Sequence, residues 1–163
     1  MPQIFFTMTT EERINQQRQL VENLGRLNEH EGMQPVAGRI FSLLMIMDKE
    51  HFTFDEIVEE LNISKSSASV AIKMLQIRGL IEYFTLPGDR KRYFRIKRHE
   101  PFNLFEEFKN KMIEKHKYMQ QILDLKADPD SKNSKYLREL CFMLEFFKES
   151  VEKLRLQYEE SKK

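Results

Sequence analysis

The side chains best suited to bind another molecule form a cluster of cations in the sequence DRKRYFRI, residues 89–96. Arg90, Lys91 and Arg92 are consecutive, and Arg95 follows between two large apolar side chains. Of the 27 basic and 26 acidic residues in the chain, residues 64–98 hold nine and two, so this segment carries a net charge of +7 and the remainder −6. Positive charge that is segregated in this way indicates a local partner with negative charge.

The cluster lies beside a predicted turn. The runs LIEYFT and KRYFRI are rich in strand-forming residues, and LPGD between them has the Pro-Gly-Asp chemistry of a turn. We predict a β-hairpin with strands near 80–85 and 92–97. Its charges have two interpretations, an edge strand that charge protects against aggregation or a loop that meets a nucleic-acid backbone. Asp89 is expected to orient a neighbouring cation through a charge-assisted hydrogen bond.

Two short helices are predicted before the hairpin. Thr53 and Glu56 form a capping-box pattern for a helix over about 54–61, and Ser64 caps a second helix over 65–78. Two such helices joined by a tight turn are typical of a helix-turn-helix. The second helix has an apolar face that can pack inward, made of Ala68, Ala71, Ile72 and Leu75.

The opposite face of the second helix carries short polar side chains, a small apolar group and cations, which suit the major groove of DNA. The free N–H groups that follow Ser64 can face a phosphate. The candidate DNA-binding residues are Ser64, Lys65, Ser66, Ser67, Ser69, Val70 and Lys73 on the helix, and Arg90, Lys91 and Arg92 on the hairpin. The alternative for the helix is an ordinary solvated surface, which the adjacent basic hairpin makes less favourable.

Long helices are predicted on both sides of this segment, over about 9–31, 35–48, 102–126 and 134–160. Gly38 lowers the helix propensity of the second of these, and close packing against another backbone is the expected reason. The last helix repeats its apolar residues at heptad spacing, which favours a helical interface. The candidate dimer-interface residues are Ile14, Val21, Leu24, Leu137, Leu144, Phe147, Val151 and Leu154. An intramolecular helical bundle is the alternative.

The predicted fold class is mainly α with a small β-hairpin: a winged helix-turn-helix flanked by long N- and C-terminal dimerisation helices. The expected domains are an N-terminal dimerisation helix (1–34), a DNA-binding domain (35–98) and a C-terminal helical dimerisation region (99–163).

Other functional classes find little support in the sequence. No Gly-rich phosphate loop or nucleophile elbow is present, so an enzyme is not expected. The four His residues lack metal-ligand spacing, and Cys141 is alone, so neither a metal nor another cofactor is expected. No apolar run is long enough to span a bilayer, and MPQIFFTM lacks the features of a secretory signal. We therefore expect a cytoplasmic protein.

Residues 53–98 resemble the winged helix-turn-helix of the MarR-type regulators. The stretches GMQPVAGRIFSLLMI, with its Gly-x-x-Pro-x-x-Gly-Arg pattern, and SKSSASVAIKMLQIRGLIEYFTLPGDRKRYFRI resemble the GbsR-type branch, and the resemblance covers roughly residues 10–125. It implies a two-fold dimer formed by the terminal helices, with Ser64 to Lys73 as the reading helix and Arg90 and Lys91 at the wing tip. Many MarR-type wings place Arg two residues after the Asp, whereas this chain has Lys91 there. Which of the three cations enters the minor groove is therefore open.

The resemblance also implies a small-molecule effector, because the GbsR-type branch is associated with choline-like osmolytes. An aromatic cage could bind a quaternary ammonium group. The available aromatic residues are Phe102, Phe105, Phe108, Tyr118, Phe142, Phe146 and Phe147. Aromatic residues at helical spacing more often pack in a core, so packing is the favoured interpretation.

The expected function is a homodimeric, sequence-specific regulator of transcription that binds double-stranded DNA, with the recognition helix in the major groove and the basic wing at the minor groove. Repression through occlusion of a promoter, under the control of an effector, is the expected mode. The alternative is a winged-helix adaptor that binds proteins without reading DNA. The adaptor offers no reason for cations on both the helix and the wing.

Overall fold

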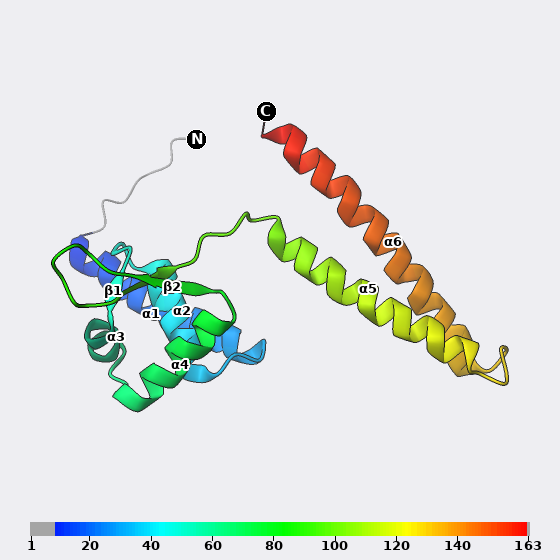
Figure 1. The fold of residues 1–163 in the computed structure, drawn as a ribbon, viewed down its shortest axis with the longest axis horizontal. Coiled ribbons are helices and arrows are strands. Elements are labelled where there is room, and N and C mark those ends of the chain that lie inside the picture. Colours follow the sequence, from blue (N-terminus) through cyan, green and yellow to red (C-terminus); the bar gives the residue numbers. More distant parts are fainter. Residues whose placement is uncertain (1–8, 163) are drawn as a thin grey trace. The chain divides into compact units, whose positions relative to one another are not determined.

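The computed structural model describes residues 9–162 and divides the chain into two units, Met1–Arg98 and His99–Lys163 (Figure 1). The first unit contains four helices among its described residues, α1 (Thr10–His30), α2 (Pro35–Ile46), α3 (Phe54–Leu61) and α4 (Lys65–Ile77). It also contains three short strands, β1 (Phe52–Thr53), β2 (Ile81–Phe84) and β3 (Tyr93–Ile96). The second unit contains α5 (Asn103–Asp124) and α6 (Lys132–Ser161).

Helices α1 and α2 pack against each other through two glycines. A Cβ atom on Gly38 would lie 2.8 Å from the carbonyl oxygen of Gly25, so the two backbones are too close for any side chain at position 38. The expectation that Gly38 packs against another backbone is confirmed. A buried hydrogen bond of 3.2 Å from Asn28 to the Ser42 hydroxyl crosses the same interface, and the hydroxyl in turn donates to the Gly38 carbonyl.

The helix-turn-helix is formed by α3 and α4, and each helix has a side-chain cap. The Thr53 hydroxyl accepts from the backbone N–H of Glu56, and the Glu56 carboxylate accepts from the N–H of Thr53. The hydrogen bond from Lys49, followed by that from the Thr53 backbone, lowers the pKa of Glu56 to about 2. Asn62 ends α3 in the left-handed conformation and begins the turn toward α4.

The core of the first unit lies between α2, α4 and the sheet. The inward face of α4 is as predicted, with Ala68, Ala71, Ile72 and Leu75 all buried. Ala71, Ile72 and Leu75 join residues from every other element of the unit in one apolar cluster, which includes Val21, Ile40, Leu43, Phe52, Ile57, Ile81 and Phe94. Burial of this face fixes the direction in which the opposite face of α4 points.

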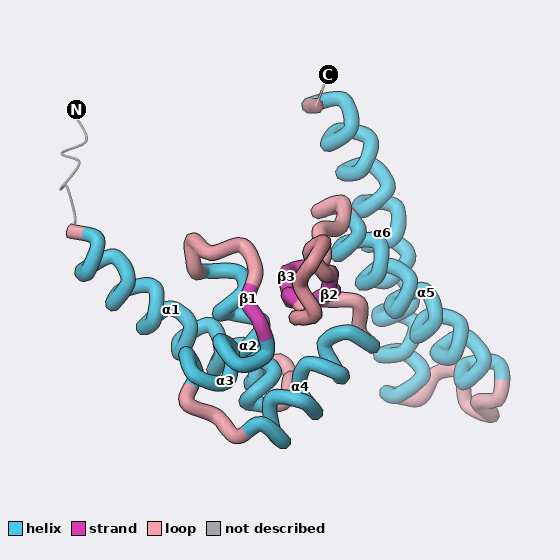
Figure 2. Tube along the Cα trace, turned by 60° about the vertical axis from the view of Figure 1, so that its left-hand side comes forward, coloured by secondary structure: helices cyan, strands magenta, loops and turns pink. Residues whose placement is uncertain are grey.

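The predicted hairpin is present as β2 and β3, and a third strand extends it. The sheet is antiparallel with the order β1-β3-β2, and Phe52 of β1 pairs with Phe94 of β3 (Figure 2). The sequence analysis did not include β1, because a strand of two residues has no periodicity that could reveal it. The predicted fold class, mainly helical with a small wing, is confirmed with this addition.

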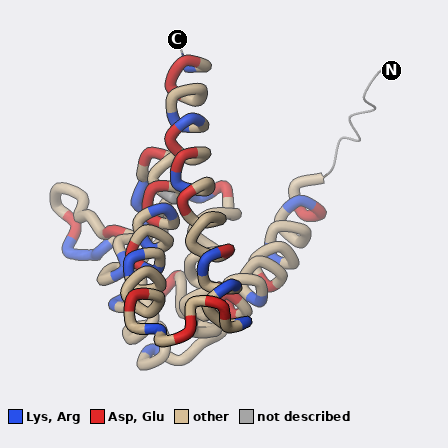
Figure 3. The backbone as a smooth tube through the Cα atoms, turned by 90° about the vertical axis from the view of Figure 1, so that its right-hand side faces the viewer, with Lys and Arg blue, Asp and Glu red and all other residues tan. Residues whose placement is uncertain are grey.

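The two helices of the second unit lie side by side as an antiparallel hairpin (Figures 1 and 2). Leu144 and Val151 of α6 are buried, and the Phe147 ring meets the Phe108 ring of α5 edge-on with centroids 5.3 Å apart. Acidic and basic residues are interspersed along both helices (Figure 3). No helix in the described part of the chain is long and apolar enough to cross a membrane.

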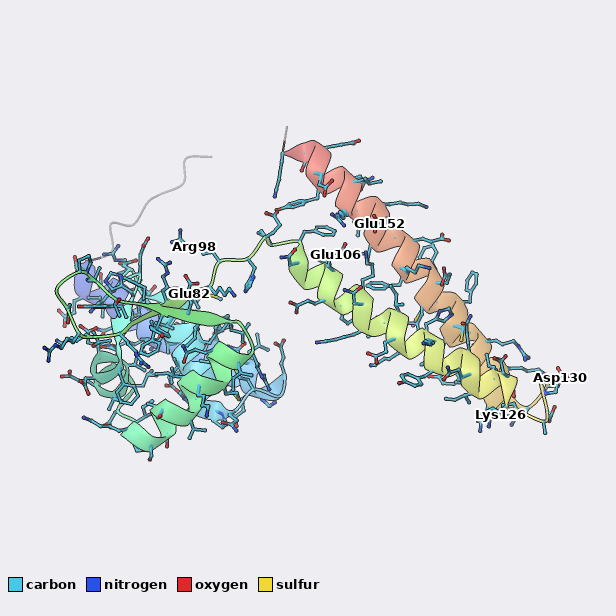
Figure 4. The ribbon with its side chains drawn as sticks, viewed as in Figure 1. Glu82, Arg98, Glu106, Lys126, Asp130 and Glu152 are labelled. Atoms are coloured by element: carbon cyan, nitrogen blue, oxygen red, sulfur yellow. The ribbon has the colours of Figure 1, made fainter. Side chains whose placement is uncertain are left out.

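Ion pairs join α5 to α6 near their free ends. The Lys109 ammonium lies 2.7 Å from Glu106 on its own helix and 3.1 Å from Glu152 on α6, and Figure 4 labels both carboxylates. At the other end, Lys126 and Asp130 flank the turn between the helices (Figure 4). Ser131 caps α6 and accepts from the N–H of Ser134.

Candidate nucleic-acid interface

The N-terminus of α4 presents three serine side chains to solvent. The Ser64 hydroxyl caps the helix by accepting from the N–H of Ser67 at 3.1 Å. The same hydroxyl lies 2.8 Å from the Ser67 hydroxyl and 3.0 Å from that of Ser66. Because the first N–H groups of a helix carry a partial positive charge, this cap lies where an anion would be favoured.

A cleft of about 590 Å³ separates α4 from the wing, the β2–β3 hairpin with its connecting loop. Ser69, Lys73 and Gln76 line it from α4, and Arg90, Lys91 and Arg92 line it from the wing. Thr53, Phe54, Asp55, Ile72 and Phe94 complete the lining. The fold thus brings four cations from two segments, 17 or more residues apart in the sequence, around one groove.

The tip of the wing is shaped by Asp89. Its carboxylate accepts a hydrogen bond of 2.9 Å from the backbone N–H of Lys91 and one of 2.6 Å from the hydroxyl of Tyr93. These bonds lower the pKa of Asp89, that from Tyr93 having the largest effect. We expected Asp89 to orient a cationic side chain, and this was wrong. The carboxylate binds the backbone and the Tyr93 hydroxyl, because the positive φ of Gly88 turns the chain back beside it.

The cations of the hairpin differ in what they contact. The guanidinium of Arg92 lies over the ring of Tyr83, 4.8 Å from its centroid. Arg95 lies over Phe84 and forms an ion pair of 2.8 Å with Glu82. The side chains of Arg90 and Lys91 form no hydrogen bond, ion pair or ring contact with residues 9–162. They are therefore available to an external anion.

The candidate DNA-binding residues fall into two groups in the structure. Five of them line the cleft: Ser69, Lys73, Arg90, Lys91 and Arg92. The others lie on the exposed N-terminal half of α4 and on its outer face: Ser64, Lys65, Ser66, Ser67 and Val70. Lys65 forms an exposed ion pair of 3.3 Å with Asp55.

The sequence analysis did not include Gln76 or Tyr83. Gln76 is three residues after Lys73 and seven after Ser69, so a helical wheel extended by one turn would have placed it on the same face. Tyr83 becomes relevant only through its contact with Arg92, and that contact depends on the pairing of β2 with β3.

Several candidate dimer-interface residues are covered by the chain itself. Val21 belongs to the core of the first unit, whereas Ile14 and Leu24 are partly buried. In α6, Leu137, Leu144, Phe147 and Val151 are buried or partly buried, and Leu154 is half exposed. The most exposed large apolar side chains of α6 are on another face, with Phe142 at 76% and Phe146 at 64% of full exposure.

The aromatic residues considered for a cage do not form a single cluster. Phe102 contacts Phe105 and Tyr158 at the free end of the hairpin, with centroids 5.4 and 5.5 Å apart. Phe108 and Phe147 form a separate pair, and Tyr118, Phe142 and Phe146 are exposed.

Comparisons with known proteins agree with this geometry. Residues 31–92 match the MarR family. The chain is 28% identical to the HTH-type transcriptional regulator MmpR5 of Mycobacterium tuberculosis over 137 residues. This aligned region covers 82% of this chain and 81% of that protein. A crystal structure described as a transcriptional regulator superposes with a TM-score of 0.67 and 26% identity, over 89% of this chain and 99% of that one.

The family match includes α4, the cleft and the wing tip, where the cations converge. The relative and the solved structure extend the likeness over most of the chain. The chain therefore has a winged helix-turn-helix whose residues 31–92 match the MarR family, and most of its length is similar to known transcriptional regulators.

Proposed function

We propose that this protein is a transcriptional regulator of the MarR type, which binds a specific sequence in duplex DNA as a homodimer and represses transcription by covering a promoter. The observation that carries the proposal is the cleft, where Lys73 of α4 and Arg90, Lys91 and Arg92 of the wing surround one groove. An anionic backbone can satisfy both sets of cations at once. Four cations that are kept close together repel one another and so raise the free energy of the unbound protein, and binding of phosphates relieves this repulsion.

The proposal divides the contacts between helix and wing. The exposed face of α4 offers Ser66, Ser69 and Val70 to base edges in the major groove, where hydroxyls can form hydrogen bonds and Val70 can meet a thymine methyl group. Arg90 and Lys91 at the wing tip contact the backbone and the minor groove, where the potential is most negative when the groove is narrow. Base contacts then specify the sequence and wing contacts supply affinity.

The homodimer is proposed from the apolar surface of α6. Phe142, Met143 and Phe146 are more than half exposed on a helix of 30 residues, and burial in a second copy would remove this surface from water. A two-fold dimer would place two α4 helices on a pseudo-palindromic site, about one turn of DNA apart. Leu20 and Leu27 of α1 are also exposed, so α1 is a further candidate for this interface.

Assignment to the GbsR-type branch is part of the proposal, supported by the pattern Gly-x-x-Pro-x-x-Gly-Arg. Gly32 has a positive φ, Pro35 begins α2, and Gly38 meets α1. Arg39 bonds to Glu22 across the same interface at 2.9 Å. A choline-like effector and a cytoplasmic location, where the chromosome is accessible, follow from this assignment.

The proposal is tested by titrating the purified protein against its own upstream DNA at several salt concentrations. Binding that neutralises phosphates releases counterions, so the logarithm of the association constant should fall linearly with the logarithm of salt concentration. An affinity that does not depend on salt would contradict the proposal. It would favour the adaptor that binds proteins instead.

Variants separate the roles of the wing and the helix. Arg90→Ala and Lys91→Ala should each weaken binding to all sequences and reduce the salt slope by about 1 per lost phosphate contact. Ser69→Ala and Val70→Ala should change the preferred sequence with little effect on the slope. Lys111→Ala, which removes an exposed cation of α5, is the matched control and should change neither quantity. If the wing variants change only the preferred DNA sequence, the assignment of base contacts to α4 and backbone contacts to the wing is wrong.

A further inference from the structure

Tyr83 lies on β2 with 47% of its surface exposed. It pairs with Phe94 across the strands, and the two ring centroids are 6.4 Å apart. Its hydroxyl forms no hydrogen bond with the residues that the structure describes. The ring is therefore placed by the sheet, and its polar end contributes nothing to the fold.

The contact between the Tyr83 ring and Arg92 suggests a function for the ring. The Arg92 guanidinium lies 4.8 Å from the ring centroid, within the range of a cation–π interaction. Arg92 also lines the cleft opposite Ser69 and Lys73 of α4. The wing tip, in contrast, gives the Arg90 and Lys91 side chains no hydrogen bond, ion pair or ring contact within residues 9–162, although the charge of Lys91 acts on nearby Asp89. Three consecutive cations thus have two different environments.

We infer that Tyr83 is a positioning residue for DNA binding, which holds Arg92 inside the cleft so that it contacts a backbone phosphate beside α4. Arg90 and Lys91, which are not held, are then the cations that reach the minor groove. The inference rests on the proposed function. A guanidinium that is already oriented loses less conformational freedom when it binds a phosphate. The Tyr83 ring therefore increases the affinity for DNA without contacting DNA itself.

Substitutions at position 83 distinguish the ring from its hydroxyl. Tyr83→Leu removes the aromatic face and should weaken binding to the upstream DNA by about 3-fold, in line with an exposed cation–π contact. Tyr83→Phe keeps the face and should bind as the natural protein does. The thermal midpoint of each variant, measured in the absence of DNA, shows whether the sheet is intact.

A double-mutant cycle tests whether Tyr83 acts through Arg92. Arg92→Ala should weaken DNA binding. Adding Tyr83→Leu to it should cause no further loss of affinity, because the guanidinium that the Tyr83 ring orients is then absent. A loss of about 3-fold in both backgrounds would show that Tyr83 acts on the fold or on DNA directly, and would overturn the inference. If the affinity of the natural protein for DNA does not depend on salt, that result would instead contradict the proposed function.

Discussion

At the scale of single residues, the wing is organised by a carboxylate and a phenol. Asp89 binds the Tyr93 hydroxyl, and this bond lowers the pKa of Asp89 and raises the pKa of Tyr93. A folded-state pKa below 3.8 means that this bond contributes at any pH above that value and is lost only as the pH falls through the lowered pKa. The shape of the wing tip is therefore insensitive to physiological pH through Asp89.

Tyr93→Phe removes the hydroxyl and keeps the ring, which packs against Phe84 and His51. We expect DNA affinity to fall by roughly 3-fold, because the wing tip loses one of the two bonds that fix it. The loss should be equal at pH 6 and pH 8, since Asp89 is ionised at both. Fluorescence anisotropy with labelled operator DNA measures it, and an affinity equal to that of the natural protein would show that the tip is shaped by its backbone alone.

At the scale of elements, the contact between α1 and α2 depends on the absence of side chains at two positions. Gly38 faces a rigid carbonyl group of Gly25, whereas a Cβ on Gly25 would lie 2.9 Å from the Cγ of Arg39, a flexible side chain that can move. The two glycines should therefore differ in how they tolerate substitution. The same contact positions α2, which packs on α4 and so supports the recognition helix.

Gly38→Ala should destabilise the protein by about 2 kcal/mol, because overpacking forces the helices apart. The gain in helix propensity of about 1 kcal/mol that Ala would otherwise give is smaller than this cost. Gly25→Ala is the matched control and should cost less. Urea denaturation followed by circular dichroism measures both, and a Gly38→Ala variant as stable as the natural protein would mean that α1 can shift freely on α2.

At the scale of the whole molecule, the two units carry different surfaces. The first unit presents the basic cleft, and the second presents the apolar residues Phe142 and Phe146 on α6. Val151 and Leu144 are already buried against α5, so the heptad pattern of α6 is satisfied in large part within the chain. The face that remains exposed is the one that a second copy would cover in the proposed homodimer.

The double variant Phe142→Lys with Phe146→Lys should shift the protein from dimer to monomer and raise the dimer dissociation constant by roughly 100-fold or more, as loss of central apolar anchors does. Helix content should be unchanged, because both side chains are exposed. Leu125→Lys, at an 87% exposed position next to the hairpin turn, is the matched control. Sedimentation velocity distinguishes the outcomes, and a variant that remains dimeric would place the interface elsewhere, with α1 the next candidate.

Much of the fold and part of the site followed from local rules. Caps at Thr53 and Ser64, the buried face of α4 and the turn at Gly88 each depend on residues within a few positions of one another. The sequence was therefore sufficient to predict the helices, the hairpin and the cations of the candidate site. The close approach at Gly38 was also predictable. Glycine in the interior of a helix lowers helix propensity, so its presence there indicates contact with another element.

The tertiary structure decided what depends on residues that are far apart in the chain. Strand β1 exists because Phe52 pairs with Phe94, and the cleft exists because Lys73 faces the wing. Heptad spacing identified an apolar seam on α6, but only packing against α5 showed which residues it covers and that Phe142 stays exposed. The sequence by itself determined which residues carry charge and where helices begin. Packing determined which of those side chains are held by a neighbour, as Arg92 is on Tyr83, and which extend into solvent at the wing tip.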